Sequence, residues 1–261
     1  MTTAIPVLLI PPSEGKAEGG RAMPVDWAMG AFGHLAADRR AVRDAVRRAL
    51  RSGGAARAEK LLGVRGAHLE RALREWRHIE ASATAPAAER YSGVVWGGLD
   101  LRTLPAPARR RAMSRIVVPS ALWGLVGARD LIPAYRLKMS ARLDGLGVLS
   151  GWWRPAASQA LAVRAGRGAV IDLLPQEHRA AIDPSALAPG RLVRVEIVED
   201  GPDGRRSVGH AGKQAKGRLA RAIVEHDART ADDVAAVRVE GLSLLSVDRG
   251  DITQVMFLRE A

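Results

Sequence analysis

Apolar residues along the chain follow two spacings, one typical of buried strands and the other of amphipathic helices. Residues 7–10 form a short apolar run closed by Pro11-Pro12, which predicts a buried strand that ends in a loop. Other runs rich in β-branched or aromatic residues predict strands at 91–96, 115–118, 169–173, 192–198, 242–247 and 254–258. Strands are therefore expected along the whole chain.

Helical spacing appears between these strands. From 37 to 50, apolar residues recur every three or four positions and arginines occupy the opposite face, which predicts an amphipathic helix. Further helices are expected at 55–62, 67–79, 107–113, 156–163, 212–225 and 231–237, with Pro155 in the first turn of the helix over 156–163. We therefore predict an α+β fold, a single compact domain over residues 1–261 with a mixed central sheet and a basic helical excursion at 37–80.

The amino-acid composition restricts the kinds of site that the protein can have and the compartment in which it is expected. The 261 residues include no cysteine, which excludes a disulfide scaffold, a thiolate metal site and a cysteine nucleophile. The first ten residues lack the features of a signal peptide, and no segment is long and uncharged enough to cross a bilayer. We expect a cytoplasmic protein without a membrane partner.

The charge balance points to an anionic partner. Lysine and arginine number 40 and the acids 28, which leaves a net charge of +12 and favours nucleic acid, acidic lipid or phosphorylated small molecules. Only five basic residues are lysine, so a GC-rich coding sequence also accounts for the excess of arginine. The charge is nevertheless clustered, because the segment 39–77 alone holds twelve basic residues against four acidic ones.

Within this basic segment, two predicted helices meet at a glycine turn, which is the outline of a helix-hairpin-helix. In that motif backbone N–H groups approach a DNA phosphate and nearby cations neutralise it without reading the sequence. An ordinary glycine-capped helical hairpin produces the same pattern. The candidate DNA-binding residues are Arg57, Lys60, Gly63, Arg65, Gly66 and Arg71.

The few lysines mark a second set of candidates. In an arginine-rich chain, a retained lysine indicates a position that needs a compact ammonium or a nucleophilic amine. On the helix over 212–225, Lys213 and Gly217 share a face, and an interior glycine costs about 1 kcal/mol, so a close approach to the backbone is one interpretation. The other interpretation is that this helix face is basic and exposed to solvent. His210 beside this face is the best candidate for a ligand or proton donor, although a packed or surface histidine is the commoner case and the scattered histidines predict no zinc site.

Several segments together resemble one known family. They are the opening LLIPPSEGK at 8–16, YSG at 91–93, SALWGLV at 120–126, IPAYRLKMS at 132–140, Asp172-Leu173 and HAGKQAKG at 210–217. In this order and spacing they are similar to the YaaA peroxide-stress protein family, over essentially the whole chain.

The resemblance implies a cytoplasmic bacterial protein with a helix-hairpin-helix-like element, associated with DNA binding and with limiting iron-driven damage under peroxide stress. It also implies a positively charged cleft lined by Lys16, Tyr135, Arg136, Met139, Lys213 and Gly217, to which we add Lys138 and Lys216. The chain departs from the family pattern at Leu174-Pro175 and His178, where relatives often have a small or hydroxyl residue and a tyrosine, and at Lys216, where many have arginine.

Two functions follow from these observations. The first is a duplex-DNA-binding protein of the oxidative-stress response, for which no cofactor is required. The alternative is an enzyme acting on a nucleotide-like or phosphorylated small molecule, with haem or iron as admissible cofactors. In that case Lys16, Arg136 and Lys213 would hold the anionic group and His210 would serve as ligand or proton donor. A purely structural partner protein is a third interpretation.

Overall fold

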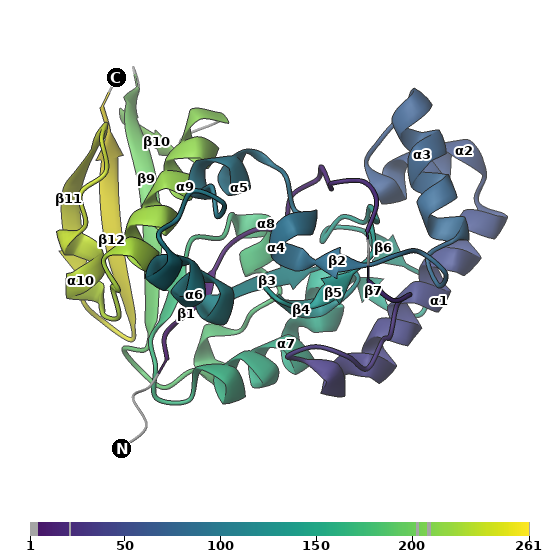
Figure 1. The fold of residues 1–261 in the computed structure, drawn as a ribbon, viewed down its shortest axis with the longest axis horizontal. Coiled ribbons are helices and arrows are strands. Elements are labelled where there is room, and N and C mark those ends of the chain that lie inside the picture. Colours follow the sequence, from purple (N-terminus) through teal and green to yellow (C-terminus); the bar gives the residue numbers. More distant parts are fainter. Residues whose placement is uncertain (1–4, 21, 202–203, 208–209, 261) are drawn as a thin grey trace.

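An eight-stranded sheet forms the centre of the molecule and joins strands that are far apart in sequence (Figure 1). The computed structural model describes residues 5–20, 22–201, 204–207 and 210–260. The strand order is β11-β12-β9-β8-β1-β3-β4, and β10 pairs with the distal part of β9. The bounds are β1 (Val7–Leu9), β3 (Ile116–Ser120), β4 (Gly124–Gly127), β8 (Val170–Asp172), β9 (Leu192–Gly201), β10 (Gly204–Ser207), β11 (Leu242–Asp248) and β12 (Ile252–Arg259).

Most of this sheet is parallel. Strands β12, β9, β8, β1 and β3 run in the same direction, and β4, β10 and β11 are antiparallel to their neighbours. The α+β prediction is therefore corrected to a mixed α/β architecture in a single compact domain. Parallel neighbours need long crossover connections, and the helical segments between β1 and β3, between β3 and β8 and between β9 and β12 supply them.

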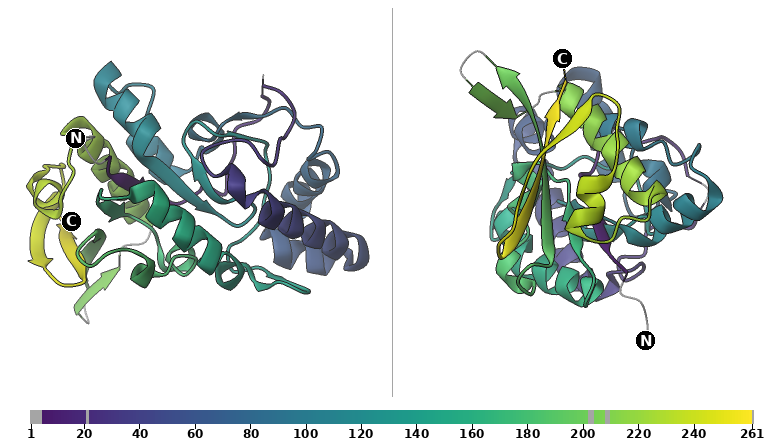
Figure 2. Two further views of the ribbon diagram at one scale, coloured as in Figure 1. Left: turned by 90° about the horizontal axis from the view of Figure 1, so that it is seen from below. Right: turned by 90° about the vertical axis from the view of Figure 1, so that its left-hand side faces the viewer.

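Helices cover both faces of the sheet (Figure 2). α6 (Ala106–Arg115) and α9 (His210–Glu225) lie on one face and α7 (Leu149–Ala165) on the other. Strand β1 between them is completely buried, as expected for a central parallel strand.

No helix in the described ranges is long and apolar enough to span a membrane. The shorter elements are β2 (Ala85–Pro86) with β5 (Leu131–Ile132), β6 (Arg142–Leu143) with β7 (Gly147–Val148), α4 (Ala87–Arg90), α5 (Val94–Leu99), α8 (Gln176–Arg179), α10 (Ala231–Ala236) and the 3₁₀ turns Gly33–Leu35 and Pro184–Ala186.

Two local predictions were wrong. Residues 94–99 form helix α5 and not a strand, because this segment packs against α9, where Gly98 lies against Gly217. Helix α7 begins at Leu149, so Pro155 and the tryptophans before it lie inside the helix. In both cases tertiary packing overrides local propensity. Strand β4 overlaps the apolar segment 120–126, for which no element was predicted.

The basic excursion consists of three helices at one end of the molecule (Figure 1), α1 (Ala36–Ser52), α2 (Gly54–Leu62) and α3 (Gly66–Arg77). Gly63 ends α2 with a φ of 70°, and its N–H donates to the carbonyl of Glu59. This is the ordinary left-handed glycine cap of a helix. The helices and their turn are thus present, but their identity as a DNA-binding helix-hairpin-helix is not confirmed.

Candidate functional site

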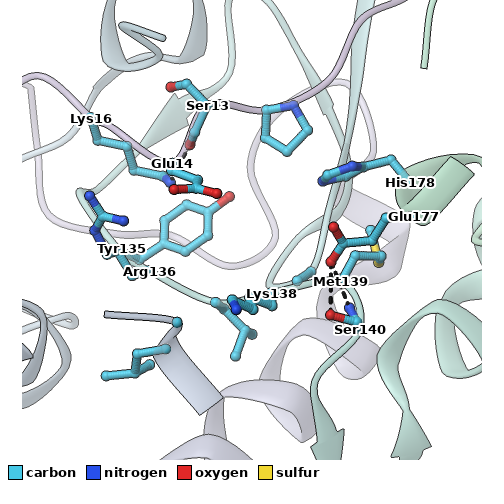
Figure 3. Close-up of a pocket in the computed structure, with 15 residues that line it drawn as sticks. Ser13, Glu14, Lys16, Tyr135, Arg136, Lys138, Met139, Ser140, Glu177 and His178 are labelled. Atoms are coloured by element: carbon cyan, nitrogen blue, oxygen red, sulfur yellow. Dashed lines mark hydrogen bonds between the residues drawn. The ribbon is translucent and has the colours of Figure 1, made fainter. Parts of the chain in front are cut away.

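A basic cavity opens where the loops after β1, β3 and β8 meet, at the carboxyl ends of these parallel strands. Its volume is about 190 Å³. Figure 3 shows the side chains that line it. In open parallel sheets, ligands bind at this carboxyl edge. They bind beside the strand at which the strand order reverses, so that later strands are added on both sides of it. Here that strand is β1, which lies between β3 and β8. The lining includes Ser13, Glu14, Lys16, Gly63, Tyr135, Arg136, Lys138, Met139, Ser140, Glu177 and His178.

The loop that follows β1 is held in place by the segment around Tyr91. The Trp96 indole donates to the carbonyl of Pro11 over 3.0 Å, and the Ser92 N–H donates to Ser13 Oγ over 3.0 Å. Lys16 itself forms an antiparallel bridge with Tyr91. Two of the motifs found in the sequence, at 8–16 and 91–93, therefore form one structural unit.

Lys16 is a half-buried residue at the wall of the cavity. Its Nζ donates to the carbonyl of Ser13 over 3.0 Å and lies 4.3 Å from the centre of the Tyr135 ring. Burial, reinforced by the positive charge of Arg136, lowers the pKa of Lys16 to about 7. A large fraction of Lys16 is therefore a neutral amine at physiological pH.

Tyr135 belongs to a buried chain of hydroxyl groups. Its hydroxyl lies 2.6 Å from Ser120 Oγ and 3.1 Å from the Tyr91 hydroxyl, and Ser120 Oγ also accepts the N–H of Trp123. Burial raises the pKa of Tyr135 to about 12 and raises that of Tyr91 still further. Both phenols are neutral at physiological pH, so they fix the shape of the cavity without adding charge.

Arg136 and Lys138 are two further basic residues of the cavity lining. Within the described residues, neither forms an ion pair with a carboxylate. The backbone of Arg136 is fixed because its carbonyl accepts the Trp76 indole N–H over 2.8 Å. Lys138 crosses directly over Gly63, where any Cβ would collide with its side chain. The glycine turn of the helical excursion therefore forms one wall of this cavity.

The opposite wall comes from α8. Ser140 donates its N–H and its hydroxyl to Glu177 Oε1, over 3.1 and 2.9 Å. His178 Nδ1 is buried and has no hydrogen-bond partner in the described structure, and burial lowers the pKa of this histidine. The helix is anchored by Arg179, which binds the buried carboxylate of Asp172 over 2.8 Å and that of Glu196 over 2.8 Å. Figure 3 shows His178 and Glu177 facing Lys16 and Arg136 across the cavity.

Five of the predicted cleft residues meet in this cavity: Lys16, Tyr135, Arg136, Lys138 and Met139. The other three do not line it. Lys213 is exposed on α9, and Lys216 is half-buried near the charges of Glu196, Arg179 and Asp172, with its pKa lowered mainly by burial. Gly217 is explained by helix packing, because a Cβ there would lie 2.8 Å from Gly98 Cα. The side chain of His210 lies outside the described residues.

The predicted DNA-binding residues are mostly engaged with acids. Arg57 pairs with Asp144 over 2.5 Å, and Arg71 pairs with Glu18 over 2.6 Å and with Glu75 over 3.0 Å. Arg65 is highly exposed and lies 3.5 Å from Glu59. Lys60 is exposed and has no ion pair in the described part of the chain, whereas Gly63 and Gly66 occupy the turn.

Sequence reasoning missed Ser120, Tyr91 and Glu177 as contributors to the site. Ser120 and Tyr91 lie inside the motifs that carried the family resemblance, so the signal was present but was not translated into a role. Nothing in the local sequence singles out Glu177, which the fold brings to Ser140. Among the described residues, no group of three His, Asp or Glu side chains can hold a metal ion.

The fold and the cavity define a class of protein, one with a mainly parallel α/β sheet whose carboxyl edge carries a small basic pocket. A family model described as peroxide stress protein YaaA matches residues 7–246. The chain therefore belongs to the peroxide stress protein YaaA family. It is 35% identical over 236 residues to a UPF0246 protein of Streptomyces coelicolor, covering 90% of this chain and 88% of that protein. It is also 33% identical over 238 residues to a UPF0246 protein of Corynebacterium glutamicum, covering 88% and 91% respectively.

Proposed function

We propose that this member of the peroxide stress protein family binds and acts on a phosphorylated, nucleotide-like small molecule in the cavity between β1, β3 and β8. One observation carries the proposal. Arg136 and Lys138 face the same cavity and have no carboxylate partner among the described residues. Cations that are left unpaired in a concave site are available to an anionic ligand, and a phosphate group is the ligand that a guanidinium and an ammonium recognise best.

The size of the cavity limits this ligand. A volume of about 190 Å³ is small for a ligand site, so it accommodates a phosphate and a short carbon chain or sugar better than a dinucleotide. The site is also preorganised, because Trp76 holds the backbone at Arg136 and Arg179 anchors the α8 wall. Little conformational entropy is then lost when the ligand binds.

Calorimetric titration with ribose 5-phosphate, AMP and inorganic phosphate tests the proposal. We expect Arg136→Met or Lys138→Met to lower the affinity for the tightest-binding of these ligands at least about tenfold. This change corresponds to the loss of one charge-assisted hydrogen bond. Arg102→Met is the matched control, because Arg102 is exposed and is not among the residues that line the cavity. Affinity that is unchanged in both cavity variants would contradict the proposal. Mass spectrometry of ligands that copurify with the protein gives an independent readout.

Duplex DNA is a second candidate ligand. It is favoured by Lys60, which is exposed and has no ion pair in the described part of the chain, and by Arg65, which is highly exposed and whose contact with Glu59 is long, at 3.5 Å. We propose that these residues contact DNA without sequence preference, as phosphate contacts do. Arg57 and Arg71 contribute less because their acidic partners already neutralise them.

The DNA hypothesis is tested by reversing exposed charges in two places. We expect the double variant Lys60→Glu/Arg65→Glu to weaken duplex binding more than about tenfold at moderate salt. The double variant Arg102→Glu/Arg110→Glu changes the net charge equally on an exposed surface outside the excursion and should weaken binding only a few-fold. Equal losses in the two variants would show that binding follows net charge and not the glycine turn.

A further inference from the structure

Lys16 differs from the other basic residues of the cavity in the groups that surround its side chain. Among the described residues, Arg136 and Lys138 have no carboxylate partner, whereas Lys16 is packed against the Tyr135 ring and its Nζ donates to the carbonyl of Ser13. The groups that face it are the positive Arg136 and Arg90, the acids Glu14 and Glu75, and His178 across the cavity. Within the described residues, none of these acids forms an ion pair with it.

We propose that Lys16 is a nucleophilic residue that forms an imine with the carbonyl carbon of a small phosphorylated aldehyde or ketone. The inference rests on the proposed function of the cavity and assigns separate tasks to its cations. Arg136 and Lys138 hold the phosphate group, and Lys16, at the wall formed by the β1 loop, meets the carbonyl end of the same molecule. A neutral amine is a poor phosphate ligand and a good nucleophile, which is why a lysine and not an arginine is suited to this position.

The chemistry balances with groups already present. The lone pair of Lys16 Nζ attacks the carbonyl carbon, and the carbonyl oxygen takes up a proton to give a carbinolamine. Its hydroxyl then leaves as water after gaining a second proton, while the nitrogen loses one of its own and forms the C=N bond. The net reaction consumes an amine, a carbonyl compound and one proton, and it yields a protonated imine and water.

His178 is the group suited to exchange these protons. It lines the same cavity opposite Lys16, and its Nδ1 has no other partner in the described structure (Figure 3). Burial lowers its pKa, which favours the neutral imidazole that can accept one proton and return it. Glu177 does not compete for this role, because it is occupied by Ser140.

Reductive trapping tests the inference on the intact protein. The protein is incubated with glyceraldehyde 3-phosphate and sodium cyanoborohydride, which reduces an imine to a stable secondary amine, and the modified peptides are mapped by mass spectrometry. The chain has only five lysines, so each candidate is resolved: Lys16, Lys60, Lys138, Lys213 and Lys216. Unphosphorylated glyceraldehyde is the matched control for the role of the phosphate.

We expect Lys16 to be modified at least about tenfold faster than any other lysine, with a half-maximal rate near pH 7. Removing the phosphate from the probe should reduce this preference, and Lys60→Arg should leave it intact. His178→Gln should slow trapping and change its pH profile. Adducts spread evenly over the lysines of the wild-type protein would overturn the inference without requiring any variant to fold. If ribose 5-phosphate binding depends on Arg136 and Lys16 is not trapped, this inference fails and the proposed function stands.

Discussion

Arginines that are equivalent in a charge count have very different tasks in this protein. Arg39 is almost completely buried and donates to four backbone carbonyls, those of Trp27, Met29, Trp123 and Leu125. Arg179 holds α8 to the sheet, whereas Arg136 faces the cavity without an acidic partner. The positive charge of the sequence is therefore partly structural, and only some of it is available to a ligand.

Arg39 offers a direct test of this structural role. We expect Arg39→Met to lower the free energy of unfolding by about 3 kcal/mol or more, because four backbone carbonyls lose their donor and three of these hydrogen bonds are buried. The neighbouring Arg40 is exposed, and Arg40→Met should change stability by less than about 0.5 kcal/mol. Urea unfolding measures both values. Equal, small effects of the two substitutions would show that the buried guanidinium contributes nothing.

Lys16 makes stability depend on pH in a defined direction. Its pKa is about 7 in the folded protein and 10.5 in the unfolded chain, so between these values the unfolded state binds more protons. The free energy of unfolding should therefore rise with pH from about 7 to about 10.5, by no more than about 1.4 kcal/mol per pH unit.

The Lys16→Met variant lacks this titration and serves as the reference. Urea unfolding of both proteins at pH 7 and pH 9 should show the wild type gaining stability relative to the variant as the pH rises. A difference between the two proteins that does not change with pH would mean that Lys16 titrates normally.

Contacts between secondary-structure elements explain the glycine that had suggested a ligand site on α9. Gly217 and Gly98 allow α9 and α5 to approach closely, and a Cβ at either position would meet the backbone of the other helix. The same contact turns residues 94–99 into a helix despite their β-branched and aromatic side chains. An interior glycine can therefore mark a helix crossing as readily as a binding surface.

Alanine substitution distinguishes packing from helix propensity. Gly217→Ala should destabilise the protein by about 1–3 kcal/mol, because the added methyl group forces α9 away from α5. Gly97→Ala introduces the same methyl group into α5 where no atom lies within 4 Å, so it should be neutral or stabilising by up to about 1 kcal/mol. Thermal and urea unfolding report the difference. A neutral Gly217→Ala variant would contradict the tight crossing.

The molecule as a whole combines a net charge of +12 with a small cavity in which two basic residues have no acidic partner among the described residues. These two features respond differently to salt. Binding to a polyanion releases many counterions, whereas a single phosphate in a cavity interacts with a few fixed charges.

Salt titration therefore separates the two proposed functions. Between about 50 and 200 mM NaCl, duplex-DNA affinity should fall roughly a thousandfold if six or more phosphates are contacted, and ribose 5-phosphate affinity should fall only a few-fold. Fluorescence anisotropy and calorimetry provide the two measurements. A shallow salt dependence of DNA binding would indicate that few of the exposed arginines reach the backbone.

Much of the fold could be predicted from local pattern. The central strand at 7–10, the arginine-faced helix at 37–50 and the helix over 212–225 were expected and are present within a residue or two of their predicted ends. The strand directions were not, because a run such as 192–198 has the same composition in a parallel or an antiparallel sheet. The family resemblance was also read correctly from motifs spread over the whole chain.

For the candidate site, the family resemblance named Lys16, Tyr135, Arg136 and Met139, and the scarcity of lysine added Lys138. The structure brings these five residues to one cavity, because they lie in two motifs that are continuous in sequence. The sequence was not sufficient to reject Gly217, to add Glu177, or to separate the unpaired Arg136 from the buried Arg39. Those distinctions depend on which side chains face each other across gaps of tens of residues. Local sequence sets helix and strand preference and the total charge. Burial, ion pairing and the lowered pKa of Lys16 arise only when the folded chain removes water from particular groups and brings distant partners into contact.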